Sequence, residues 1–343
     1  MENGEHLHFA VSSHQVVQCD LSSTYFEREM ESCEIVSVEQ SIESADDARP
    51  KLLICRIWAF ARRLNKILHR NPETQVIVQL SGQKHVSIGE AALIVGGYLI
   101  LSNRLQLQDV IGRFECFQDN PIEGSGLDPY ISQQHVTVHD CWKALHHVRT
   151  LGWIDWSDLG EEDSDPPFLV DEFLHYASPA NGNVHIIAPG YLMLFASPVD
   201  LLAGQHWTSL PSQGRGAPVR RFSAAFYADL FSDLGVASVA CLTECRASTA
   251  AFAACGIAAL DLRPGHRHGQ SVLRALDGLL SLTRAGPVAV HGGGESGGWP
   301  GDAAVVVAAL LVGRLGFAER SAYAWLLMLC PWLLAARASA VEY

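Results

Sequence analysis

The chain has no lysine after Lys143, no C-x-x-C cysteine pair and no long apolar run. Its 37 acidic side chains exceed its 24 basic ones, which gives a formal net charge of −13. This acidic balance argues against nucleic acid or an anionic membrane surface as a partner. The longest apolar stretches, 302–313 and 322–336, are shorter than the roughly 20 residues that span a bilayer. We therefore expect a soluble protein without a membrane span.

The nine cysteines are scattered, and the sequence begins with the polar, acidic residues MENGEH. An odd number of cysteines without a secretory signal is typical of free thiols in a reducing compartment. We therefore predict a cytoplasmic location. Cys241, Cys245 and Cys255 fall on segments predicted to be strands and helices of the core, so we expect each of them to be a buried thiol.

The length and the composition predict two domains. A chain of 343 residues is long enough for two domains of about 150 residues each. Alanine occurs 8 times in residues 1–170 and 32 times in residues 171–343. Between these halves, residues 155–172 hold eight acids, no base and two adjacent prolines, which is typical of a solvated linker. We place the domains at 1–156 and 184–343, with an acidic linker at 157–183.

Strands, loops and helices alternate in both halves, which predicts an α/β fold. In the first half we predict strands at 7–10, 34–38 and 75–80 and helices at 51–69, 87–101 and 136–151. Ser87 is the expected N-cap of the second helix, with Glu90 completing a capping box. In the second half we predict strands at 185–189, 191–197, 236–242, 257–262 and 287–291 and helices at 222–234, 249–255, 270–283, 302–315 and 319–329. Each half should form a central, mostly parallel sheet flanked by helices.

One stretch of the second half has the composition of a binding site. The sequence HGGGESGGWPG at 291–301 lies between a predicted buried strand and a helix. Backbone N–H groups in such a loop, together with a helix N-terminus, can hold an anion. The candidate anion-binding loop consists of His291, Gly292, Gly293, Gly294, Glu295, Ser296, Gly297 and Gly298. A Walker A loop is excluded because this stretch contains no lysine.

Two enzyme motifs match the same loop formally. Residues 294–298 satisfy G-x-S-x-G, the nucleophile elbow of serine hydrolases, with Ser296 as the nucleophile. No histidine follows His291, so Ser296 lacks its base in the expected chain order. Residues 292–297 satisfy G-x-G-x-x-G, but the acidic residue downstream, Glu319, opens a predicted helix instead of ending a second strand. A serine hydrolase acting through Ser296 is the weaker alternative for this loop.

The order strand, histidine, loop and helix is also that of the protein tyrosine and dual-specificity phosphatases, whose loop reads His-Cys-x-x-Gly-x-x-Arg. The likeness extends to GWIDW at 152–156, DEFLHY at 171–176, NVHIIAPGYLMLFASP at 183–198 and GIAALDL at 256–262. On these motifs the chain resembles the cell division cycle fourteen phosphatases, and residues 1–150 resemble their non-catalytic, phosphatase-like N-terminal domain. The resemblance implies two tandem dual-specificity-phosphatase-like domains, the second of them degenerate.

The residues that carry the family's chemistry are missing from this sequence. Gly292 stands where the resemblance places the cysteine nucleophile, and Gly298 where it places the arginine that clamps the phosphoryl group. The general-acid aspartate falls on His266 or Arg267, and Glu295 adds a negative charge to the loop. Losing a covalent nucleophile or a transition-state clamp costs several orders of magnitude in rate. The resemblance therefore implies a phosphatase fold without phosphatase activity.

We accordingly expect a catalytically inactive pseudophosphatase, not an enzyme, that needs no cofactor and no metal. Its expected role is that of a structural or scaffold subunit with protein partners in a larger assembly. The alternative is a reader that binds a phosphorylated protein in the degenerate loop without cleaving it. The resembled family associates with centrosomes, spindles and ciliary structures, which implies a location at the cytoskeleton, the centrosome or the cilium.

Four smaller groups have both a chemical and a structural interpretation. They are His266 with His268 as metal ligands or a phosphate contact, His146 with His147 near a helix end, Arg220 with Arg221 as an anion site, and Trp153 with Trp156 as anchors for a partner. We favour exposed loop positions for His266 and His268, and an interaction with the helix dipole for His146 and His147. For the two arginines we favour a surface position. For the tryptophans, packing at the inter-domain surface is an equal alternative.

Overall fold

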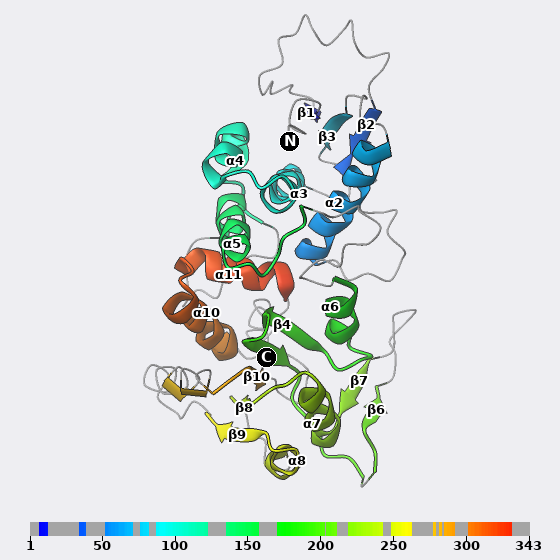
Figure 1. The fold of residues 1–343 in the computed structure, drawn as a ribbon, viewed down its shortest axis with the longest axis vertical. Helices are drawn as coiled ribbons and strands as arrows, with labels where there is room; N and C mark the ends of the chain where they lie inside the picture. Colours follow the sequence, from blue (N-terminus) through cyan, green and yellow to red (C-terminus); the bar gives the residue numbers. More distant parts are fainter. Residues whose placement is uncertain are drawn as a thin grey trace, which may run out of the picture. The chain divides into compact units, whose positions relative to one another are not determined.

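The computed structural model describes residues 7–12, 34–38, 52–70, 76–81, 87–122, 135–157, 170–202, 204–210, 219–242, 248–262, 277–278, 281–282, 285–291 and 301–330. The fold is mixed α/β (Figure 1). The chain divides into two compact units, one formed by residues 1–123 and 135–170 and the other by 124–134 and 171–343.

The first unit contains a small parallel sheet and a group of helices. Strands β1 (Leu7–Ser12), β2 (Glu34–Ser37) and β3 (Val76–Ser81) pair in the order β1-β3-β2. The helices are α2 (Leu53–Arg70), α3 (Ile88–Leu101), α4 (Leu107–Arg113), the short 3-10 helix η2 (Glu115–Phe117) and α5 (Val138–Thr150). Helix α3 packs against both α2 and α5 and is buried along nearly its whole length.

Two glycines explain why α3 approaches its neighbours so closely. A Cβ atom at Gly96 would lie 2.2 Å from Nε1 of Trp142 on α5, and one at Gly97 would lie 3.0 Å from Ile57 on α2. Trp142 is itself fully buried, and its indole N–H donates to the Leu93 carbonyl at 3.4 Å. The backbone of α3 therefore occupies the space that side chains would fill at these positions.

The helix caps confirm one expected feature and correct another. The Ser87 side chain accepts a hydrogen bond from the Glu90 N–H, so the predicted N-cap of α3 is confirmed. The reciprocal half of the capping box is wrong, because the Glu90 carboxylate pairs with Arg56 of α2 instead. A complete capping box begins α5, where Thr137 and Asp140 bond to each other's backbone N–H groups.

The second unit is built on a five-stranded sheet in the order β4-β5-β10-β8-β9. Its strands are β4 (Val184–Ala188), β5 (Leu192–Phe195), β8 (Ser238–Cys241), β9 (Ala258–Asp261) and β10 (Val288–His291). All neighbours are parallel except β4 and β5, which are antiparallel. The expectation of a mostly parallel sheet flanked by helices is confirmed for this unit.

Within the described ranges, five helices with defined bounds and a two-stranded ribbon accompany this sheet. They are α6 (Val170–Ala177), α7 (Ala224–Asp233), α8 (Ser248–Ala254), α10 (Gly301–Leu315), α11 (Glu319–Leu329), β6 (Trp207–Ser209) and β7 (Arg220–Phe222). Every residue of β10 is buried, so the sheet centre is covered on both faces. On α11, the indole N–H of Trp325 donates to the Ile187 carbonyl of β4 at 2.9 Å.

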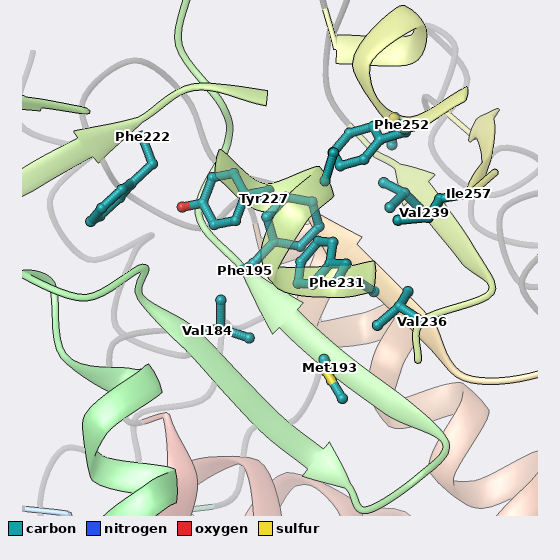
Figure 2. Close-up of a cluster of buried hydrophobic side chains, with 13 residues drawn as sticks. Val184, Met193, Phe195, Phe222, Tyr227, Phe231, Val236, Val239, Phe252 and Ile257 are labelled. Atoms are coloured by element: carbon teal, nitrogen blue, oxygen red, sulfur yellow. The ribbon is translucent and has the colours of Figure 1, made fainter. Parts of the chain in front are cut away.

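An aromatic cluster forms the core between the sheet and helices α7 and α8 (Figure 2). Phe195 of β5 lies at its centre, with its ring centroid 4.8 Å from that of Tyr227 and 4.7 Å from that of Phe231. Phe252 of α8 joins the same group, 6.3 Å from Phe231. The second unit therefore buries enough aromatic surface to hold β5 and its neighbours in fixed register.

Most of the predicted elements appear within two or three residues of their expected bounds, whereas α4, α6 and the ribbon β6–β7 were not predicted. Helix α6 lies inside the range 157–183 that we expected to be a linker, and residues 158–169 of that range lie outside the described residues. The predicted helix at 270–283 lies largely outside them as well. The domain bounds and the tandem phosphatase-like character of the two units remain predictions. None of the helices in the described ranges is both long and apolar enough to cross a membrane.

Candidate functional site

The carboxyl ends of four parallel strands meet at one edge of the five-stranded sheet. There Phe195, His291, Cys241 and Asp261 stand side by side in register on β5, β10, β8 and β9. In open α/β sheets, ligands bind outside the carboxyl ends of the strands. The candidate anion-binding loop starts at this edge, because His291 is the last residue of β10 and α10 begins at Gly301.

His291 is held in place from three sides. Its ring is fully buried, and Nδ1 lies 3.3 Å from the Ser197 hydroxyl, within hydrogen-bond distance. The Phe195 ring packs against it in an edge-to-face arrangement at 5.2 Å. Its carbonyl accepts a hydrogen bond of 3.0 Å from the Leu242 N–H. The chain therefore leaves the sheet at a fixed point before the glycine-rich segment begins.

Ser197 and His291 together have the composition of a nucleophile and its base. A purely positioning role for His291 would require the same burial of its imidazole and the same packing on Phe195. In that role the serine hydroxyl fixes the orientation of the ring at the end of the central strand. The structure thus pairs His291 with Ser197, a residue that follows β5 and that we did not expect at the site.

No local signal in the sequence identifies Ser197. It lies in the tripeptide Ala196-Ser197-Pro198 directly after a strand, far from His291 along the chain. Only the strand order, in which β5 neighbours β10, brings the two together. Ser197 becomes a candidate only if every hydroxyl or acidic residue that directly follows a parallel strand is considered.

The remaining predicted site residues lie outside the described residues. These are Gly292, Gly293, Gly294, Glu295, Ser296, Gly297 and Gly298 of the loop, and His266 at the position matched to the general acid. Of the predicted site, His291 is the part that the structure describes. The assignment of an anion-binding loop and of its missing catalytic groups therefore remains a prediction from the sequence.

The three cysteines that we expected to be buried have different outcomes. Cys241 is buried at the end of β8, as expected. Cys255 is exposed, so the expectation of a buried thiol is wrong there. It belongs to an exposed stretch, 253–256, in which α8 ends and the chain turns through Gly256, whose φ is 75°. Cys245 lies outside the described residues.

One histidine of the pair at the end of α5, His146, departs from the expectation. Burial lowers the pKa of His146, and the positive charges of Arg149 and His147 lower it further. The protonated form is therefore disfavoured, contrary to the expected interaction of a histidine cation with the helix dipole. The Nε2 atom of His146 lies 3.4 Å from the side-chain oxygen of Gln106.

The structure also shows where the two arginines and Trp156 lie. Arg220 and Arg221 lie half-buried on β7, which precedes helix α7. Trp156 is fully buried and donates its backbone N–H to the Leu101 carbonyl, so it is no exposed anchor for a partner. Within the part of the chain that the structure describes, no three histidine, cysteine or acidic side chains gather as metal ligands would. The pair His266 and His268 lies outside that part.

The fold and this sheet edge define an α/β protein with a mostly parallel sheet and a glycine-rich connection after its central strand. Comparison with known proteins does not assign the chain to any family within this class. No protein-family model matches the sequence, and no curated protein matches it. The likeness to dual-specificity phosphatases therefore rests on the sequence motifs.

Proposed function

We propose that the chain is a catalytically inactive member of the dual-specificity phosphatase class, acting as a structural or scaffold subunit of a protein assembly. The observation that supports this is the composition of residues 292–301, which contain neither cysteine nor arginine. These residues follow the central strand β10, where the phosphatases carry their nucleophile and their phosphate clamp. Without a thiolate and a guanidinium, phosphoryl transfer has no covalent acceptor and no charge stabilisation at this edge.

The catalytic half of the proposal is tested with para-nitrophenyl phosphate. We expect the protein to hydrolyse it no faster than buffer does. The double variant Gly292→Cys with Gly298→Arg should gain less than about tenfold, because His266 replaces the acid that protonates the leaving group and Glu295 repels the phosphate. Hydrolysis by the unaltered chain that disappears in Ser296→Ala or Ser197→Ala would contradict the proposal and favour a serine enzyme.

The scaffold half is tested on the protein in its native source. Size-exclusion of a native extract should place the chain in a complex well above its own 37.3 kDa, with partners in fixed proportion. Treatment of the extract with a broad phosphatase should leave that complex intact, because the proposed contacts need no phosphate group. Collapse of the complex on dephosphorylation would favour the phosphopeptide reader instead, and elution as a free chain would contradict both.

The cytoskeletal, centrosomal or ciliary location belongs to the same proposal. It follows from the family resemblance and from no feature of the sheet or its edge. Antibody staining of fixed cells would test it, and a uniform cytoplasmic signal would contradict it.

A further inference from the structure

The ribbon β6–β7 of the second unit has one open edge. Hydrogen bonds from Ser223 N–H to the His206 carbonyl and from Leu210 N–H to the Val219 carbonyl fix its register. In such an antiparallel ladder every second residue bonds to the partner strand. On β6, therefore, Trp207 and Ser209 direct their backbone N–H and carbonyl groups away from β7.

The outer edge of β7 is occupied, whereas that of β6 is not. Arg220 N–H donates to the Pro179 carbonyl at 3.1 Å, and Val199 N–H donates to the Phe222 carbonyl at 2.9 Å. Among the described residues, no strand pairs with β6 on its other side, and all three of its residues are exposed. Figure 1 shows β6 as the outer strand of the ribbon. An open edge of this kind is a template for another extended segment.

Two large apolar side chains, one on β6 and one shortly before it in the sequence, are in contact with water. Trp207 is 49% exposed and Leu202 is 76% exposed. The guanidinium of Arg220 lies over the Trp207 indole at 5.3 Å, which holds the ring at the surface. Tryptophan at a protein surface is characteristic of binding sites, because its large apolar area gains most from contact with a partner.

The charge at this surface is opposite to that of the chain as a whole. No aspartate or glutamate occurs from Leu201 to Ala228, a stretch that includes Arg220 and Arg221 of β7, in a protein of net charge −13. The Arg220 guanidinium donates to the Ala180 carbonyl. It belongs neither to the ion pair Arg56–Glu90 nor to the ion pair Arg104–Asp155. The local charge is therefore positive, and it favours an acidic partner.

We propose that β6 is a docking edge for an extended acidic segment of a partner protein, which adds to the ribbon as a third strand. Backbone hydrogen bonds to Trp207 and Ser209 supply affinity for an extended chain. The Trp207 ring, together with Arg220 and Arg221 of β7, selects acidic side chains on the partner segment. This surface lies on different elements from the glycine-rich loop, so the inference holds whether or not the loop is inactive.

The test uses a fluorescent decapeptide of alternating glutamate and threonine, titrated with the full chain and followed by anisotropy. We expect saturable binding that weakens at least tenfold in Ser209→Pro and in Trp207→Ala. Proline at 209 removes an N–H that points away from β7, so the ribbon should still form. The matched control is Thr208→Ala, which changes an exposed side chain of the same strand and should leave binding within about twofold.

Peptide controls separate backbone pairing from charge attraction. The same peptide N-methylated at both its threonines and its glutamates has no backbone donor on either edge and should bind at least tenfold more weakly. A lysine-threonine peptide should not bind. This peptide series still tests backbone pairing if Ser209→Pro does not fold, which circular dichroism would reveal.

Three results with the peptides would overturn the inference. They are the absence of saturable binding by the acidic peptide, equal binding by the lysine peptide, and unchanged binding by the N-methylated peptide. A concentration-dependent dimer in sedimentation that Ser209→Pro abolishes would also overturn it, because the edge would then belong to a second copy of the chain.

Discussion

Replacing Gly96 with alanine is expected to destabilise the first unit by about 3 kcal/mol, the upper range for overpacking a well-filled core. The added Cβ would lie 2.2 Å from Nε1 and 2.5 Å from Cε2 of Trp142, which is far inside van der Waals contact. Trp142 cannot move outward easily, because it is fully buried, packs against Phe114 at 5.9 Å and donates to the Leu93 carbonyl. Helices α3 and α5 must therefore separate to admit the methyl group.

The matched control is Gly112→Ala on α4. A Cβ there meets nothing within 4 Å, so the variant should gain about 0.5 kcal/mol from the smaller conformational entropy of alanine in the unfolded chain. Urea unfolding followed by tryptophan fluorescence and circular dichroism would measure both variants. Equal stability of Gly96→Ala and the unaltered chain would contradict the close approach of α3 and α5.

Elements with a periodic apolar face or a buried apolar run could be predicted from the sequence, and the ribbon β6–β7 could not. Along α2, Ile57, Ala61 and Leu64 repeat at helical spacing and are all buried, so the pattern carried enough information. The three residues of β6 are all exposed and show no alternation of burial. Its existence depends on pairing with β7, which lies outside any local window of sequence.

The candidate site also has one feature that could be predicted from the sequence and one that could not. The glycine-rich composition after His291 is visible in the sequence because a run of glycines needs no partner to be noticed. The contact between His291 and Ser197 is not visible, since it depends on the order of β5 and β10 in the sheet. Cys255 was misplaced for another reason: α8 is already exposed at Ala253 and Ala254, so a position at the end of this helix is not a core position.

Acid should destabilise the second unit through His185, by about 2 kcal/mol between pH 7 and pH 5. Burial lowers the pKa of this histidine on β4 from 6.5 to about 3. Its Nε2 lies 2.9 Å from the Asn183 side-chain oxygen, and the Phe173 ring packs on it. Below pH 6.5 the unfolded chain takes up a proton that the folded chain refuses until about pH 3, so folding loses free energy throughout that interval.

The variant His185→Gln isolates this contribution, because glutamine keeps an N–H donor for Asn183 and carries no charge at any pH. Urea unfolding at pH 7 and pH 5, followed by pulsed hydrogen exchange in peptides from β4 and β5, would give the loss of stability for each protein. Carboxylates contribute to that loss in both proteins, so the part owed to His185 is the difference between them. His206→Gln, at an exposed position of the same unit, controls for the loss of a histidine as such. If the unaltered chain and His185→Gln lose the same stability on acidification, the buried imidazole is not the acid-sensitive group of this sheet.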